Sequence, residues 1–190
     1  AGAESVFGMI DELPEQDDGT QSLDDVRGEL VFENVSYRYP AAKDNALDGV
    51  TFTIAAGSTA ALVGPSGSGK TTIASLVPRF YEVGDGRILL DGVDIRELTL
   101  NNLRSHISYV GQEPVLFNDS VAANIAYGIN GAVTREEIEG AARAAYALDF
   151  INELPDGFET VVGEDGVMLS GGQRQRVAIA RALLKDAPVL

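Results

Sequence analysis

The sequence predicts an α/β or α+β domain, and three observations carry that prediction. Strand-like segments dominate the start of the chain, and helical segments follow later. An apolar run at 59–63 leads into a glycine-rich loop and then a helical stretch, which indicates a strand–loop–helix unit. The 190 residues are 45% hydrophobic and 23% charged, a composition that suits one soluble domain with a core.

The first 28 residues differ from the rest of the chain. Val6, Ile10 and Leu13 share one face of a predicted amphipathic helix over residues 1–13, which Pro14 ends. Residues 14–28 are acidic and carry few large apolar side chains, so they are expected to form a linker. The two segments are either a disordered tail or the end of a helix that enters from an upstream domain.

Strands are expected where apolar and polar residues alternate or where short apolar runs occur. Alternation predicts a half-buried strand at 47–54, and the run at 59–63 predicts a strand buried on both faces. Further strands are expected at 30–37, 87–90 and 107–110.

Helices are expected after the glycine-rich loop, to about Val77, and in two later segments. Thr134 and Glu137 form a capping-box pattern at the start of the predicted helix 134–148. The segment 171–185 has apolar and arginine residues at helical spacing, so it is predicted to be another helix.

Composition excludes several classes of function. The chain has no cysteine, so disulfides, thiolate metal sites and cysteine nucleophiles are absent, and its one histidine, His106, rules out a histidine-rich metal site. The net charge of −15 argues against nucleic acid as a partner. Nine acidic residues and one basic residue lie in positions 1–29, which concentrates much of that charge at the start.

The glycine-rich loop at 64–71 matches the phosphate-binding pattern G-x-x-x-x-G-K-[ST] in a strand–loop–helix context. Its glycines let backbone N–H groups point at phosphate oxygens, and the following helix adds its N-terminal partial positive charge. Lys70 supplies a cation for the β- and γ-phosphates, and the Thr71 hydroxyl can ligate Mg²⁺. A plain glycine-rich turn would lack the Lys-Thr pair, so the motif predicts a nucleoside triphosphate site.

Residues 169–173 read Leu-Ser-Gly-Gly-Gln and open the predicted helix 171–185. A helix that starts with serine and two glycines presents a second set of N–H groups to an anion. One nucleotide does not need two such sites on one domain, so the second could serve a nucleotide held by another copy. Alternatively, Ser170 is only an N-cap and the glycines form a turn.

The two motifs together resemble the nucleotide-binding domain of ABC transporters of the exporter type, and the likeness runs along the whole chain. The resemblance implies a P-loop NTPase core with an antiparallel β subdomain and an α-helical signature subdomain. It also implies that two copies sandwich ATP head to tail, each nucleotide lying between one copy's phosphate loop and the other's signature.

The resemblance assigns roles to individual residues. Tyr39 resembles the aromatic residue that stacks on adenine, although Tyr37 competes for this role. Gln112 resembles the glutamine that completes the Mg²⁺ shell; an exposed loop glutamine is the alternative. Lys70 and Gln112 are the expected catalytic residues, and Thr71 and Gln112 are the expected metal ligands. The expected nucleotide-binding residues are Tyr39, Gly64, Ser66, Gly67, Ser68, Gly69, Lys70, Thr71, Thr72, Gln112, Ser170, Gly171, Gly172 and Gln173.

The same resemblance implies partners and a location. Residues 160–166 look like the loop with which exporters contact their transmembrane domain, and the Gln112 region is expected to make a similar contact. We expect residues 1–28 to connect that domain to a partial nucleotide-binding domain at 29–190. Segments 117–127 and 148–152 look like those of bacterial lipid A flippases, which implies lipid export at the cytoplasmic face of the inner membrane.

The resemblance also places a catalytic Asp and Glu, and a switch histidine, after Leu190; His106 is not that histidine. We therefore expect these 190 residues alone to bind Mg-ATP weakly and to hydrolyse it negligibly. The alternatives are an exporter of peptides or drugs, an importer ATPase, and a soluble ABC ATPase that acts on DNA or ribosomes. The short spacing between Lys70 and Ser170, the acidic charge and residues 1–28 disfavour the last two.

Overall fold

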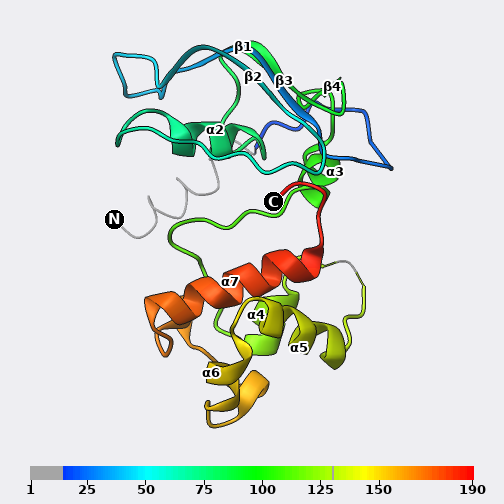
Figure 1. The fold of residues 1–190 in the computed structure, drawn as a ribbon, viewed down its shortest axis with the longest axis vertical. Coiled ribbons are helices and arrows are strands. Elements are labelled where there is room, and N and C mark those ends of the chain that lie inside the picture. The colour runs from blue at the N-terminus through cyan, green and yellow to red at the C-terminus, as the bar shows by residue number, and fades with distance from the viewer. Residues whose placement is uncertain (1–14, 130) are drawn as a thin grey trace, which may run out of the picture. The chain divides into compact units, whose positions relative to one another are not determined.

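The computed structural model describes residues 15–129 and 131–190, which form two compact units (Figure 1). The sheet unit contains residues 15–24, Val31–Phe52 and Leu62–Leu103, and the helical unit contains Asp25–Leu30, Thr53–Ala61 and Arg104–Leu190. The helix predicted for residues 1–13 lies outside the described residues.

A four-stranded sheet forms the centre of the sheet unit, in the order β2-β1-β3-β4 (Figure 1). Strands β3 and β4 are antiparallel, with Leu90 opposite Val93. The predicted strands at 30–37, 47–54 and 87–90 are confirmed. The four strands are β1 (Leu30–Tyr37), β2 (Leu47–Ile54), β3 (Asp85–Leu90) and β4 (Val93–Asp94).

Strand β1 buries alternate residues on either side of an interruption. Leu30 and Phe32 are buried, and so are Val35 and Tyr37, so the alternation shifts by one residue at Asn34. Asn34 has a φ of 52°, a left-handed conformation that breaks the two-residue period of a strand. This shift keeps Tyr37 on the buried face at the end of the strand.

Two short helices complete the sheet unit. Helix α2 (Lys70–Leu76) confirms the helix predicted after the glycine-rich loop, and α3 is Leu100–Ser105. Leu76 and Leu103 from these helices are fully buried, as are the largest side chains of the sheet and its connections. The fully buried residues of this core include Phe32, Leu76, Ile88, Leu90, Ile95, Leu98 and Leu103.

The prediction of a buried strand at 59–63 is wrong. The segment has no regular secondary structure in the described chain, and Val63 is 87% exposed. A strand buried on both faces needs neighbouring strands to bond its backbone, and the four-stranded sheet does not include this segment. The apolar run has the side chains that are typical of a central strand. Its sequence does not show whether neighbouring strands are there to bond its backbone.

The acidic stretch before β1 is bound to the sheet unit from Gln16 to Leu23. The N–H groups of Thr20 and Gln21 both donate to the Glu97 carbonyl at 2.9 Å. The Asp17 carboxylate accepts the N–H of Leu100, at the start of α3, at 2.8 Å. The stretch has the irregular backbone expected of a linker, but these hydrogen bonds fix its course over α3.

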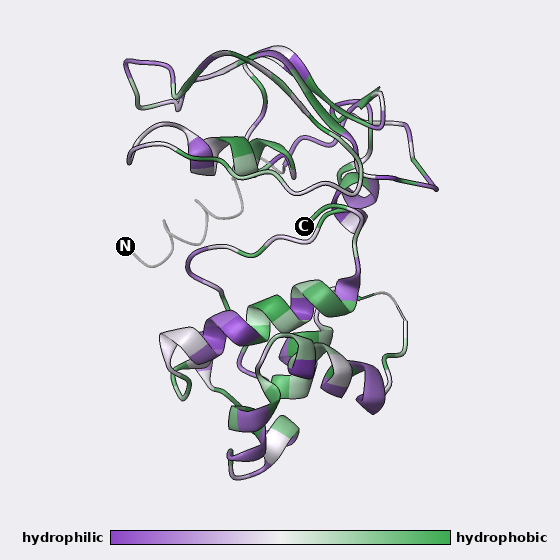
Figure 2. Ribbon diagram, in the orientation of Figure 1, coloured by the Kyte–Doolittle hydropathy of each residue, from purple (hydrophilic) through white to green (hydrophobic). Residues whose placement is uncertain are grey.

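Five short helical elements and one long helix form the described part of the helical unit. Helices α4 and α5 pack against α7, and their apolar side chains form one core with Phe150, Ile151 and Phe158. Hydrophobic and hydrophilic residues alternate along α7 (Figure 2). The elements are α4 (Val121–Ala126), α5 (Arg135–Ala144), α6 (Leu148–Asn152), η1 (Gly157–Glu159), η2 (Glu164–Gly166) and α7 (Gly171–Lys185).

Both predicted helices of this unit are confirmed. The capping box of Thr134 and Glu137 is present, with each side chain bonded to the other residue's backbone N–H. Helix α5 ends at Ala144, earlier than predicted, because Tyr146 has a left-handed φ of 54° before α6 begins. Helix α7 has the predicted bounds.

The predicted strand at 107–110 is reduced to one parallel bridge between Ile107 and Val189. The Ser108 N–H donates to the Val189 carbonyl at 2.8 Å, and the Val189 N–H donates to the His106 carbonyl at 3.2 Å. His106 thus contributes its backbone to this pairing. Among the described residues, no helix is both long and apolar enough to cross a membrane.

Candidate nucleotide site

The phosphate loop leaves the first N–H groups of α2 without a side-chain acceptor. Gly69 is the N-cap residue, with a φ of 83°, and no side chain caps the helix. A Cβ at Gly69 would lie 2.6 Å from the Ala46 carbonyl oxygen and from a Leu47 methyl carbon, so this position needs glycine. Uncapped N–H groups at a helix start are suited to an anion.

Lys70 folds back over its own loop. Its ammonium Nζ donates to the Gly64 carbonyl at 2.9 Å and to the Pro65 carbonyl at 2.7 Å. A longer contact of 3.4 Å joins it to the Ser68 hydroxyl. The cation is therefore held beside the backbone of its own loop. Ser66, Gly67 and Thr71 of the same loop are exposed.

Tyr39 belongs to a cluster of three tyrosine rings in the sheet unit. Its ring centroid lies 4.9 Å from that of Tyr37 and 5.2 Å from that of Tyr81, and both pairs of ring planes cross at 85°. The Tyr39 hydroxyl lies 3.0 Å from the Thr72 hydroxyl, in the first turn of α2. Two expected nucleotide-binding residues, Tyr39 and Thr72, are therefore in direct contact.

Tyr37 is buried, whereas Tyr39 is half-buried. Burial, together with the nearby Tyr39 and Tyr81 phenols, raises the pKa of Tyr37. A buried ring offers little free face for a base, so the geometry favours Tyr39 over Tyr37 as a stacking platform.

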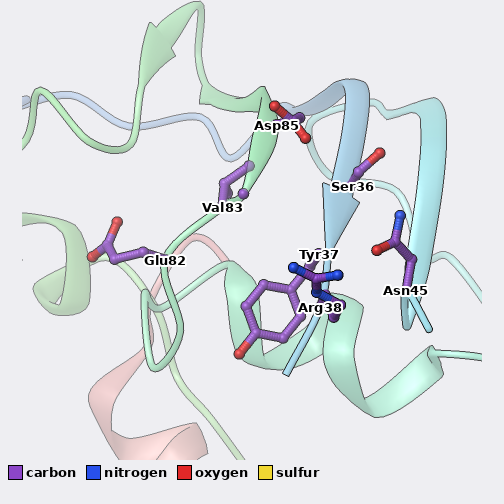
Figure 3. Close-up of a pocket in the computed structure, with 8 residues that line it drawn as sticks. Ser36, Tyr37, Arg38, Asn45, Glu82, Val83 and Asp85 are labelled. Carbon is purple, nitrogen blue, oxygen red and sulfur yellow. The ribbon is translucent and has the colours of Figure 1, made fainter. Parts of the chain in front are cut away.

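An open pocket of about 600 Å³ lies beside Tyr37 (Figure 3). Glu82 and Asp85 contribute two carboxylates and Arg38 one guanidinium, so the lining carries an excess of negative charge. That charge disfavours a triphosphate, and the phosphate loop contributes no residue to this pocket. Its lining residues are Ser36, Tyr37, Arg38, Asn45, Glu82, Val83, Gly84 and Asp85.

The start of α7 in the helical unit carries a capping box. The Ser170 hydroxyl accepts the Gln173 N–H at 3.3 Å, and the Gln173 side-chain oxygen accepts the Ser170 N–H at 2.8 Å. The N-cap alternative raised for Ser170 is thus present in the structure. The capping box uses one acceptor position of the hydroxyl and leaves its proton free to donate elsewhere.

Capping does not explain the two glycines that follow Ser170. Gly171 and Gly172 are exposed and have helical backbone, and a Cβ at Gly172 would meet nothing within 4 Å. Glycine inside a helix costs about 0.5–1 kcal/mol relative to alanine. The fold therefore gives no reason for glycine at position 172.

Gln112 is exposed and lies in an irregular loop of the helical unit. Thr71, the other expected metal ligand, is exposed in the sheet unit. Their hydroxyl and amide oxygens are of the hard-donor class that Mg²⁺ prefers, so the donor chemistry fits. Among the described residues, no group of three or more acidic or histidine side chains could itself hold a metal.

The loop at 160–166 is anchored to α4. Thr160 accepts the Val121 N–H at 3.0 Å, and Val161 pairs with Ser120 in an antiparallel bridge. Val162 is buried, while the neighbouring Val161 is exposed. The loop therefore presents an apolar side chain from a fixed backbone.

A buried polar network near α4 was not predicted from the sequence. Asn124 is 1% exposed; its amide donates to the carbonyls of Phe117, Asp119 and Ser120, and its oxygen accepts the Phe117 N–H. Arg181 of α7 donates to the Asn124 carbonyl at 2.8 Å, and burial lowers the pKa of this guanidinium. The only sequence signal for this network was the position of Asn124 directly before the apolar residues Ile125 and Ala126.

Known proteins resemble this chain closely. Residues 47–190 match the family described as ABC transporter. An "ATP-dependent lipid A-core flippase" of Pseudomonas aeruginosa is 58% identical over 190 residues, and one of Chromobacterium violaceum is 61% identical. Both alignments cover 100% of this chain and 32% of the relative, so the chain spans about a third of the length of these relatives.

A solved structure shares the fold. The structure of a bacterial Atm1-family ABC exporter with ATP bound superposes with a TM-score of 0.87 at 46% identity, covering 99% of this chain and 33% of the exporter. The predicted fold class, an ABC ATPase fold with a sheet subdomain and a helical signature subdomain, is therefore confirmed. By its matched residues, its two motifs and its fold, the chain belongs to the ABC transporter family.

Proposed function

We propose that the chain is the ATP-binding and ATP-hydrolysing part of an ABC exporter, and that this exporter moves a lipid A-type lipid. The uncapped start of α2 beside Lys70 is the observation that carries the nucleotide site. The identity of 52–61% to flippases over the whole chain supports the lipid. The lower identity of 46% to the Atm1-family exporter disfavours a different export substrate.

In this proposal the phosphate loop binds the triphosphate and neutralises its charge. A phosphate oxygen would replace the Gly64 and Pro65 carbonyls as the acceptor for Lys70. The N–H groups of the loop and of α2 would hold the β- and γ-phosphates, and Tyr39 would stack on adenine. Mg²⁺, held by Thr71 and Gln112, would offset the charge that develops during phosphoryl transfer.

A second copy of the domain supplies the other half of each site. Its Ser170, Gly171, Gly172 and Gln173 would face the γ-phosphate, and the open space over Gly172 leaves the α7 backbone accessible to it. The Ser170 proton, which the capping box does not use, is the donor for that contact. ATP therefore closes a head-to-tail pair, and hydrolysis lets it reopen.

In this proposal the Gln112 region and the 160–166 loop contact the membrane domain of the same polypeptide, and an exposed aromatic pair of the same unit adds apolar surface. The rings of Phe117 and Tyr127 lie 4.2 Å apart and are 43% and 54% exposed. The Arg181 guanidinium lies 5.5 Å from the Tyr127 centroid. The 160–166 loop and the Gln112 loop, the segments expected to contact that domain at the cytoplasmic side of the inner membrane, belong to the same unit, and the exposed Val161 adds an apolar side chain to it.

The test uses the full-length transporter and separates the two halves of the site. Lys70→Ala should abolish hydrolysis and weaken ATP binding, while Lys43→Ala, at an exposed lysine outside the site, should do neither. Ser170→Ala should lower turnover while ATP binding to the separated copies stays nearly intact. If Ser170→Ala weakened that binding as much as Lys70→Ala, the two-copy site would be wrong.

The lipid is tested separately. Turnover of the transporter in lipid nanodiscs should rise when lipid A is added. No rise with lipid A, together with a rise on addition of a peptide or a drug, would show a different export substrate and leave the nucleotide site standing.

A further inference from the structure

Tyr81 follows α2 and is 41% exposed, yet its ring lies against both other tyrosines of the cluster. Its centroid is 5.2 Å from that of Tyr39 and 5.6 Å from that of Tyr37. Tyr81 is not part of the phosphate loop, and the functional assignment above gives it no role. Its contacts make it the part of the cluster that joins the end of α2 to the end of β1.

Three contacts restrain the Tyr39 side chain before any nucleotide is present. Tyr37 and Tyr81 both cross its ring plane at 85°, a geometry that attractive aromatic pairs adopt. The Thr72 hydroxyl, 3.0 Å away, restrains the tip of the ring. Thr72 and Tyr37 are buried, so two of the restraints belong to the rigid core.

Tyr81 is the one of the three partners of Tyr39 that is exposed, so it is the restraint on the Tyr39 ring that can be removed without opening the core. Without it, the Tyr39 ring would have room to leave its position, and only a fraction of molecules would present a platform to the base. Apparent affinity falls in proportion to that fraction. Tyr81 lies outside the phosphate loop at 64–71, so the affinity of that loop for phosphate would not change.

We propose that Tyr81 is a positioning residue that holds the Tyr39 ring in the orientation in which it stacks on the purine. This inference rests on the proposed function, in which Tyr39 stacks on adenine. Tyr81 thereby sets the part of nucleotide affinity that depends on the base, and it leaves the part that depends on the phosphates unchanged.

The experiment measures the affinity of the full-length transporter for a non-hydrolysable ATP analogue and for inorganic tripolyphosphate, by calorimetry. Tyr81→Ala should weaken analogue binding about two- to tenfold, the effect of losing one ordered side chain, and should leave tripolyphosphate binding unchanged. Tyr81→Phe, which keeps the ring, should restore analogue binding. Tyr146→Ala is the control, since Tyr146 is 83% exposed in the other unit.

A double variant identifies the path of the effect. In a Tyr39→Ala background, Tyr81→Ala should cause no further loss, because its action runs through Tyr39. Equal losses for the analogue and for tripolyphosphate would show a merely structural role and overturn the inference, as would an unchanged analogue affinity in Tyr81→Ala. If Tyr39→Ala itself left analogue affinity unchanged, the adenine platform of the proposed function would be wrong, and the inference would fall with it.

Discussion

The start of α2 and the start of α7 are both glycine-rich and both expected to meet phosphate, but they are built differently. At α2 the glycine is forced by backbone conformation and by the neighbours Ala46 and Leu47, and no side chain caps the helix. At α7 a complete capping box serves the helix, and Gly172 has open space around it. The fold of the chain itself requires glycine at the first site, whereas the second is a capped helix whose own fold does not require glycine at position 172.

Gly69→Ala gives the largest expected effect, and it tests the first half of this comparison. A left-handed conformation costs a non-glycine residue about 1–3 kcal/mol, and the contacts at 2.6 Å add a steric clash. We expect the phosphate loop to be displaced and ATP binding to be lost, as measured by calorimetry.

Gly128→Ala is the matched control for backbone strain. Gly128 has a φ of 82°, close to that of Gly69, but a Cβ there would meet nothing within 4 Å. This variant should lower stability while ATP binding is kept. ATP binding by Gly69→Ala at the level of the unchanged protein would contradict the account of the loop.

Asn124→Ala tests how firmly the helical unit holds its own loops. The change removes the buried amide, leaves the Phe117 N–H without its partner and takes from Arg181 its 3.3 Å contact with the Asn124 side-chain oxygen, so we expect a loss of about 1–3 kcal/mol in the free energy of unfolding. Urea denaturation measures this loss. Asn118→Ala, at an exposed neighbouring position, should change stability little; equal effects of the two variants would show that the network is unimportant.

A smaller effect concerns the other capping box, at α5. The Thr134 backbone N–H and hydroxyl donate to the Glu137 carboxylate and lower its pKa below the ordinary 4.5. The unfolded chain therefore binds the proton more readily, so this stabilisation is present above the ordinary pKa and is lost as the pH falls through the lowered one.

Glu137→Gln keeps the capping oxygen but removes the titration. The difference in stability between the two proteins should be constant near neutral pH and should change below about pH 4.5. Urea denaturation at a series of pH values measures it. A difference that stays the same at every pH would show that the carboxylate does not titrate with folding.

Local signals predicted most of the elements. The alternation at 47–54, the capping box at Thr134 and the arginine-rich helix at 171–185 each act within a few residues, so the sequence shows them directly. The strand at 59–63 was wrong because a buried strand depends on partners distant in the sequence. The course of the acidic stretch was missed for the same reason: Asp17 bonds to Leu100, 83 residues later.

The candidate site follows the same rule as the fold: the parts defined by local motifs were predicted from the sequence, and the parts defined by distant contacts were not. The phosphate loop and the signature have fixed spacing, so Lys70 and Ser170 were evident from the sequence alone. The sequence left Tyr37 as a competitor of Tyr39 because a spacing of two residues places both on one face of an extended segment. In the structure β1 ends at Tyr37, and burial separates the two rings. Tyr81 carries no motif, and its role depends on ring contacts that no spacing predicts.

Gly172→Ala in the full-length transporter tests most directly the claim that the start of α7 serves something outside its own fold. Alanine should stabilise the helix by about 0.5–1 kcal/mol. Gly140→Ala is the matched control, since Gly140 lies in α5 with equally open space around it and should stabilise by a similar amount. We predict that ATP turnover falls in Gly172→Ala and is unchanged in Gly140→Ala; equal turnover in both variants would contradict the account.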